Sequence, residues 1–121
     1  MAYVDGFLLP VPKKKLGVYK KMATVASKVW LDHGALQYVE AVGEDLTPGF
    51  GLSFKKVSKP KAGETVVFAF IVYRSRAHRD AVNKKVMKDK RLAESCDPAR
   101  MPFNPKRMAW GGFQVLVEKA R

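Results

Sequence analysis

The chain has little of what metal centres and disulfide frameworks need. Its 121 residues include one cysteine, Cys96, and two histidines, His33 and His78. A single cysteine cannot form an internal disulfide, and one Cys with two His is too few for a zinc cluster. No Gly-rich phosphate loop, serine nucleophile elbow or carboxylate-rich metal motif is present either. The sequence therefore predicts no bound metal and points to no cofactor.

Long apolar runs are also missing. The longest, Val66 to Tyr73, has eight residues, whereas a membrane-spanning helix needs about 20. Asp5 and Pro10 interrupt the N-terminal stretch where a signal peptide would carry its apolar core. Hydrophobic residues nevertheless make up 47% of the chain, which is enough for a packed interior. We expect a single cytoplasmic domain over residues 1–121 with no membrane partner.

Acidic residues are scarce relative to basic ones. The chain has 23 Lys and Arg against 11 Asp and Glu, so its formal net charge is +12. Residues 61–121 hold fourteen of the basic and six of the acidic residues, so the excess is concentrated in the second half. A basic surface attracts polyanions and steers anionic ligands, but it can also serve solubility alone. Nucleic acid is therefore one of the partners to consider.

Strand and helix patterns alternate clearly along the chain. The strongest strand signal, Thr65–Tyr73, has apolar residues on both faces. A helical stripe of apolar residues at spacings of three and four precedes it, formed by Leu16, Tyr19, Ala23, Ala26 and Trp30. Ser75 is placed to cap the second helix. Between the second and third strands we expect a loop that could carry a short edge strand at Gly51–Val57. The predicted strands are residues 2–11, 35–45, 65–73 and 107–118, and the predicted helices are residues 13–33 and 75–89, followed by a helical turn within 90–103.

The element order β-α-β-β-α-β has a consequence for the two sheet faces. Right-handed crossovers in two split β-α-β units place both helices on the same side of the sheet. One face is then uncovered by the helices. Because residues 65–73 are apolar on both faces, something else must cover the second one. The sequence therefore predicts an α+β fold with an apolar face that needs a partner.

Three stretches of the chain resemble a bacterial family. They are AYVDGFLLPVPKK (Ala2–Lys14), GETVVFAFIVYRSRAHRDAVNKKVMKD (Gly63–Asp89) and MPFNPKRMAWGGFQVL (Met101–Leu116), and they are similar to the YbaA-like family, whose function is unknown. The resemblance spans nearly the whole chain. It implies a ferredoxin-like β-α-β-β-α-β sandwich of the dimeric α+β barrel class. In that class two sheets pack face to face in a homodimer, and ligands lie between sheet and helices.

The RNA-recognition motif has the same element order. Phe68–Tyr73 is similar to the last six positions of its strand signature, although Val66-Val67 replaces the basic residue and the glycine. Tyr3, Phe68 and Phe70 would then form a platform on which bases stack. In a dimeric barrel the same three residues would instead lie at the subunit interface. Both interpretations stay open at this point.

Three arginines mark a candidate ligand-binding site. Arg74, Arg76 and Arg79 lie where the third strand leads into the second helix. Exposed amides at a helix start, together with arginine side chains, bind anions. Trp110 is a further candidate, because it precedes Gly111-Gly112, where missing side chains could leave room for a ligand. The two glycines also suggest a bulge or a close backbone approach in the last strand.

Two residues are candidate catalytic groups. Asp5 lies inside an apolar strand, where a carboxylate is costly unless it is paired, and Arg74 is one possible partner for an ion pair. His78 lies in the first turn of the second helix beside arginines, which favours a neutral imidazole able to take part in acid-base chemistry. Glu40, on the second strand, has the same ambiguity as Asp5 with a weaker signal.

These observations favour one function and leave two alternatives. The favoured one is an uncharacterised small cytoplasmic homodimer that binds a small, partly apolar, anionic molecule between sheet and helices. The first alternative is RNA binding through the basic half and the sheet face. The second is a cofactor-free monooxygenase or isomerase whose activity rests on pocket chemistry alone.

Overall fold

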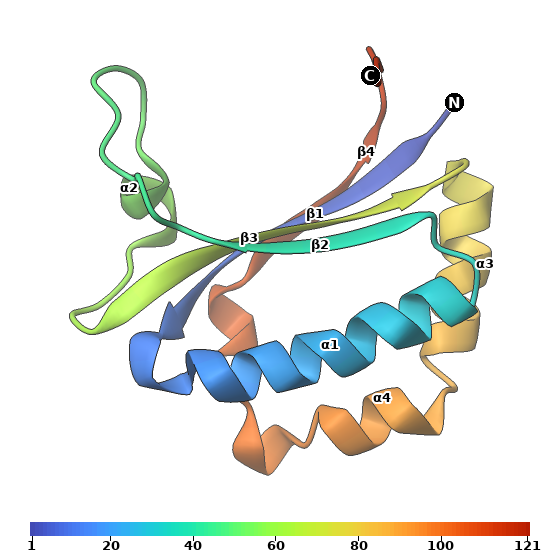
Figure 1. Cartoon of the computed structure of the whole chain (residues 1–121), viewed down its shortest axis with the longest axis horizontal. Helices are drawn as coiled ribbons and strands as arrows, with labels where there is room; N and C mark the ends of the chain where they lie inside the picture. The colour runs from blue at the N-terminus through green and yellow to red at the C-terminus, as the bar shows by residue number, and fades with distance from the viewer.

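Four strands form one antiparallel sheet, and three of the helices lie against one side of it (Figure 1). A computed structural model describes all residues from 1 to 121. The strands are β1 (Tyr3–Pro12), β2 (Gln37–Val42), β3 (Glu64–Tyr73) and β4 (Ala109–Gln114), in the spatial order β2-β3-β1-β4. The helices are α1 (Leu16–Asp32), α2 (Phe54–Ser58), α3 (Arg76–Val86) and α4 (Lys90–Ser95), with 3-10 turns at Lys13–Lys15, Pro98–Arg100 and Pro105–Arg107. None of these helices is both long and apolar enough to cross a bilayer.

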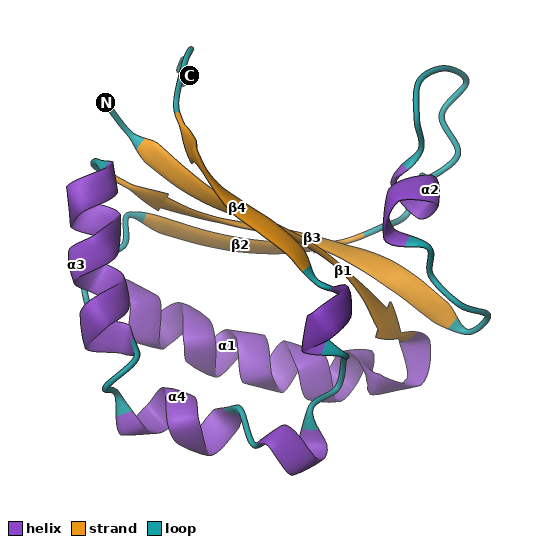
Figure 2. Cartoon of the chain, turned by 180° about the vertical axis from the view of Figure 1, so that it is seen from behind, coloured by secondary structure: helices purple, strands orange, loops and turns teal.

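The helix-facing side of the sheet forms the core. Alternation along β3 turns Val67 and Ile71 toward the helices, where both are buried. Leu9 of β1 packs with Tyr19 and Ala23 of α1 in the same layer. The apolar stripe predicted for the first helix is therefore the stripe that contacts the sheet. Figure 2 shows α4 running alongside α1, on the same side of the sheet.

The opposite face of the sheet is covered by none of α1, α3 and α4, as same-side packing of the helices predicts. Near α2, which contacts β1 and β3, its residues Pro10 and Val66 are buried, and the rest of the face is open. Its strand residues include no lysine or arginine. Phe68 and Phe113 are 45% and 62% exposed there. Phe54 of α2 reaches over the edge of this face, with its ring centroid 6.2 Å from that of Phe68. The remaining strand residues of the face are Val4, Gly6, Leu8, Pro10, Pro12, Gln37, Val39, Ala41, Glu64, Val66, Phe70, Val72, Ala109 and Gly111.

The expected short strand at Gly51–Val57 is wrong, because Phe54–Ser58 forms the helix α2 instead. The Ser53 side chain accepts a hydrogen bond from the Lys56 amide at 3.3 Å, an N-cap that favours a helix. Lys59, with φ at 52°, ends the helix. The segment lies against the inner strands β1 and β3 and not beside β2 or β4, the edges of the sheet where a further strand could pair.

The last strand is shorter than the predicted residues 107–118. Its neighbour β1 begins at Tyr3, which lies opposite Gln114, so the residues beyond Gln114 have little left to pair with. At the other end, pairing between β1 and β4 stops at Leu8. Pro10 follows two residues later and has no N–H to donate to a ladder. The extent of β4 is therefore limited by β1 at both ends.

A bidentate ion pair joins the segment before β4 to the start of β3. Arg107 Nη1 lies 2.8 Å from Glu64 Oε2, and Nη2 lies 2.9 Å from Oε1. The hydrogen bonds from Arg107 hold the pKa of the Glu64 carboxyl below its ordinary value of 4.5. The charged form of Glu64 is therefore stabilised by folding.

We predict that Arg107→Gln destabilises the protein at neutral pH but much less in acid. Because the folded-state pKa of Glu64 is lowered, the stabilisation is present above the unfolded value, about pH 4.5, and is lost as the pH falls through the folded value. Urea midpoints of the variant and the wild type should therefore differ most at neutral pH and converge in acid. Arg100→Gln is the control, since that arginine is 88% exposed and lies 3.9 Å from Asp97. A midpoint difference independent of pH would contradict the prediction.

Candidate functional site

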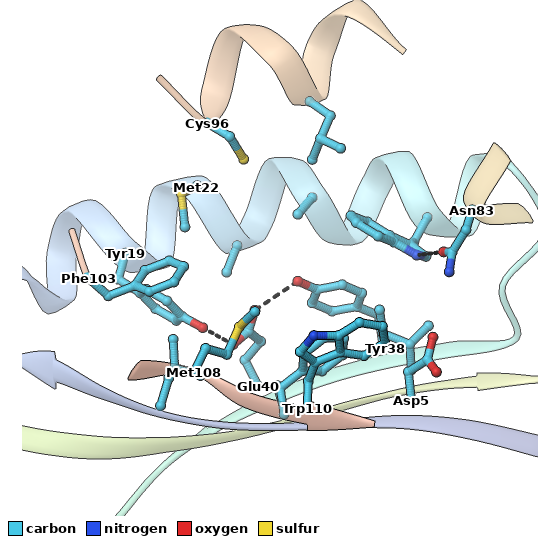
Figure 3. Close-up of a pocket in the computed structure, with 18 of the residues that line it drawn as sticks. Asp5, Tyr19, Met22, Tyr38, Glu40, Asn83, Cys96, Phe103, Met108 and Trp110 are labelled. Atoms are coloured by element: carbon cyan, nitrogen blue, oxygen red, sulfur yellow. Dashed lines mark hydrogen bonds between the residues drawn. The ribbon is translucent and has the colours of Figure 1, made fainter. Parts of the chain in front are cut away.

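A cavity of about 340 Å³ lies between the sheet and the helices (Figure 3). All four strands, α1, the end of α3 and α4 contribute to its wall, and sixteen of its nineteen lining residues are hydrophobic. The other three are Asp5, Glu40 and Asn83. Trp110 and Met87 are 60% and 67% exposed, so they mark where the cavity meets solvent. An apolar cavity of this size with a few polar groups is typical of a small-molecule site.

Glu40 is the most prominent polar group of this cavity. Tyr19 of α1 donates its hydroxyl to Oε1 at 2.5 Å, and Tyr38 donates to Oε2 at 2.8 Å. Tyr38 and Glu40 share a face of β2 because they are two residues apart. Burial and the neighbouring Glu40 raise the pKa of both phenols well above the ordinary value of 10.0. Both tyrosines therefore stay protonated and act as donors.

Asp5 is buried and ion-paired, as the structural interpretation of the sequence predicts, but its partner is Arg79 rather than Arg74. Arg79 Nε lies 3.0 Å from Asp5 Oδ1. The same guanidinium bonds Asp80 at 2.8 Å and lies 5.1 Å from the centre of the Tyr3 ring. Asp5 thus borders the cavity with its charge already compensated.

His78 does not line the cavity. Its Nδ1 accepts a hydrogen bond from the Arg74 amide at 2.9 Å, and its own amide donates to Ser75 Oγ at 3.1 Å. The ring packs edge-on against Tyr73. Burial and then the Arg74 charge lower the pKa of His78 below 6.5. The imidazole closes the turn before α3, and Ser75 caps that helix as predicted.

The three arginines do not form one anion site. Arg79 is occupied by carboxylates, Arg74 is exposed, and Arg76 lines a separate hollow beside Met1 and Tyr3. None of the three lines the cavity between sheet and helices. The charged groups that do line it are carboxylates, which repel an anion. The predicted anionic character of the ligand therefore finds no support in the cavity.

Trp110 does line the cavity. Its ring stacks on Phe7 of the neighbouring strand, with centroids 6.1 Å apart and planes 18° from parallel. The two glycines after it do not form a bulge, because β4 stays in register with β1. The β4 backbone does approach neighbouring side chains closely at Gly112, however. A Cβ at Gly112 would lie closer than 3.0 Å to side-chain atoms of Tyr3 and Arg79.

The predicted platform of Tyr3, Phe68 and Phe70 is wrong in one member. Tyr3 pairs with Tyr73 in the β-ladder, and directly paired residues point to the same face. Tyr3 therefore faces the helices, where it is buried. Phe68 and Phe70 lie on the open face, and the aromatic ring that joins them there is that of Phe113.

Several cavity residues were not singled out from the sequence. Tyr38 carried a signal, because it shares a predicted strand face with Glu40. Asn83 of α3, which accepts a hydrogen bond from Trp30 Nε1 at 3.0 Å, and Cys96 after α4 carried none, since only packing brings these helices over the sheet. No group of three or more His, Cys, Asp or Glu side chains is placed to hold a metal ion.

Comparison with known proteins confirms the family resemblance. Residues 2–105 match the family described as "Protein of unknown function (DUF1428)". The chain is 40% identical over 119 residues to the uncharacterized protein YbaA of Escherichia coli K12, covering 98% of this chain and all of that one. The same values hold for the uncharacterized YbaA of Shigella flexneri.

A solved structure shares the fold. It is that of an uncharacterized NIPSNAP domain protein from Burkholderia xenovorans, with a TM-score of 0.57 and 11% identity. The match covers 98% of this chain and 99% of the other. At this identity the likeness concerns the arrangement of strands and helices alone.

We predict that Gly112→Ala destabilises the protein and that Gly111→Ala does not. The added methyl at residue 112 must displace Tyr3 or Arg79, and overpacking of this kind costs about 1–3 kcal/mol. At Gly111 the nearest atom, in the Phe113 ring, would be 3.7 Å from the Cβ, which is an ordinary contact. Thermal unfolding of the two variants measures the difference. Equal melting temperatures would contradict the close approach described here.

Proposed function

We propose that this chain, which belongs to the DUF1428 family of proteins of unknown function, binds a small, largely apolar molecule in the cavity between sheet and helices. The observation that carries the proposal is the cavity itself, about 340 Å³ with sixteen hydrophobic residues among nineteen. Close packing normally leaves few voids larger than a water molecule. A cavity of this size is therefore better explained as a ligand-binding site than as a packing void.

The lining suits a flat or aromatic molecule. Tyr19 and Phe103 pack edge to face at one end, with ring centroids 5.7 Å apart. Trp30 and Tyr38 are 6.0 Å apart at the other end. Rings of a ligand would gain the same offset or edge contacts with these side chains. The Phe7 and Trp110 pair adds a third aromatic contact at the mouth.

The enzymatic alternative, a cofactor-free monooxygenase or isomerase, depended on Asp5 and His78. Asp5 is engaged by Arg79, and His78 lies outside the cavity wall. Their placement gives them no shared site at which to act on one substrate. Binding is therefore the function that the geometry supports best.

We further propose a ferredoxin-like, dimeric α+β barrel in which the open sheet face is covered by a second copy of the chain. The order β2-β3-β1-β4, with each crossover helix joining two strands that flank a third, supports the ferredoxin-like arrangement. The open face has exposed phenylalanines and no basic strand residue. Such a face suits burial against another apolar face better than contact with phosphates.

Filling the cavity should remove binding. Ala26→Phe places a ring in the cavity, so the space for a ligand is occupied. We expect the affinity for a neutral apolar dye such as N-phenylnaphthylamine, measured by the enhancement of its fluorescence on binding, to fall about tenfold or more. Ala81→Phe, at an exposed position of α3, is the matched control and should bind like the wild type. Failure of the wild type to bind the dye, or equal binding by Ala26→Phe, would contradict the proposal.

Charging the open face should separate the dimer. We expect a wild-type mass near twice 13.5 kDa by light scattering on a sizing column, and a monomer for Phe68→Glu, because a buried unpaired carboxylate is costly. Leu31→Glu on α1 is the control, since Leu31 is 46% exposed and Phe68 45%. A monomeric wild type whose absorbance at 260 nm reveals nucleic acid would overturn the dimer and favour the RNA-binding alternative.

A further inference from the structure

Glu40 is unusual among the carboxylates of this protein. Four acidic side chains are not exposed to solvent, and three of them form ion pairs. Asp5 pairs with Arg79, Glu64 with Arg107, and Asp89 with Arg91. Glu40 has no cation within ion-pair distance, and the groups that bond it are the two tyrosine hydroxyls.

The bonding capacity of Glu40 is only partly used. A carboxylate offers about four acceptor positions on its two oxygens, and the tyrosines occupy one on each oxygen. A charge held in apolar surroundings is stabilised strongly by a counter-ion. The remaining positions border the cavity, because Glu40 itself lines it. Figure 3 shows the Glu40 side chain between the phenols of Tyr19 and Tyr38, below α1.

The surroundings of Glu40 favour a positive group as well. Tyr19 and Tyr38 present rings beside the carboxylate, and Trp110 and Phe103 line the same cavity. The face of an aromatic ring attracts a cation, by about 0.5–2 kcal/mol depending on how far water is excluded. No lysine or arginine lines the cavity. The protein thus supplies negative charge and ring faces there, and no cation of its own.

We propose that the ligand of this cavity is an organic amine, whose ammonium group binds Glu40 while its apolar body packs among the aromatic side chains. This inference rests on the proposed binding function and names the chemical class of the ligand. The ammonium donates to the free positions of the Glu40 oxygens. It replaces the counter-ion that the fold provides to the other three carboxylates.

The overall charge of +12 works against a cation at long range but not at the site. Repulsion between exposed charges is screened beyond about 8 Å at physiological salt, while a pair inside an apolar cavity is screened much less. Added salt should therefore accelerate the arrival of an amine, by weakening the surface repulsion. An anion or a polyanion would show the opposite salt dependence.

The test uses three probes that share one aromatic body: naphthylmethylamine, naphthylmethanol and naphthoate. We expect the intact protein to bind the amine about tenfold or more tightly than the alcohol, since a charge-assisted hydrogen bond is roughly twice as strong as a neutral one. The carboxylate should bind more weakly than either. Titration of tryptophan fluorescence, with Trp30 and Trp110 in the cavity wall, measures all three affinities.

Substitution of Glu40 assigns the preference to one residue. Glu40→Gln should reduce amine affinity to that of the alcohol and leave alcohol affinity nearly unchanged, which also shows that the cavity is intact. Glu94→Gln, at an exposed position of α4, is the control and should keep the preference for the amine.

The outcomes separate this inference from the proposed function. If the alcohol binds and the amine binds no more tightly, or if naphthoate binds best, the amine proposal is overturned while the binding cavity stands. If the wild type prefers the amine but Glu40→Gln keeps that preference, the assignment to Glu40 is overturned. If none of the probes binds the wild type, both the amine proposal and the proposed function fail.

Discussion

Both faces of β3 are apolar, and the helices can cover only one of them. The two crossovers lie on the same side of the sheet, so α1, α3 and α4 gather there (Figures 1 and 2). Val67 and Ile71 are buried as a result, while Phe68 is left 45% exposed. The cavity and the open face both follow from this one-sided arrangement. One is the space left between the sheet and the helices α1 and α4, and the other is the part of the sheet that these helices do not cover.

The positive charge of the protein also differs between the open sheet face and the helices and loops. Most of the basic excess is on exposed helices and loops, whereas the strand residues of the open face include no lysine or arginine. Inside, arginines neutralise Asp5 and Glu64, so these carboxylates connect elements rather than bind ligands. Glu40 stands apart because two phenols hold it without neutralising it. A carboxylate left in that state inside an apolar cavity is the feature that most directly suggests what the cavity binds.

The comparisons with known proteins support the fold, whereas the functional proposal is argued from the geometry of the cavity. YbaA of E. coli matches over its whole length at 40% identity and is itself uncharacterized. The NIPSNAP domain protein shares the arrangement of elements at 11% identity, which carries no information on ligands. The cavity, its aromatic lining and Glu40 are therefore the basis of the functional proposal. The amine hypothesis replaces the anionic ligand expected from the sequence, because the arginines behind that expectation are outside the cavity wall.

Local patterns were sufficient for the elements themselves. The alternation in residues 65–73, the helical stripe through Tyr19 and Ala23, and the cap at Ser75 are properties of neighbouring residues, and each is found as predicted. The uncovered face also followed from the element order, since crossover handedness is a general rule. These features depend on backbone periodicity, which can be read from the sequence alone.

The site was decided by tertiary structure. Which face Tyr3 occupies depends on its register with Tyr73, because a shift of one residue exchanges the two faces of a strand. The partner of Asp5 is Arg79, 74 positions away, and Glu40 meets Tyr19 only because α1 packs across β2. Sequence periodicity assigns each residue to a face of its own element. The partner it meets there is set by how the elements pack, and that involves residues far apart in the chain.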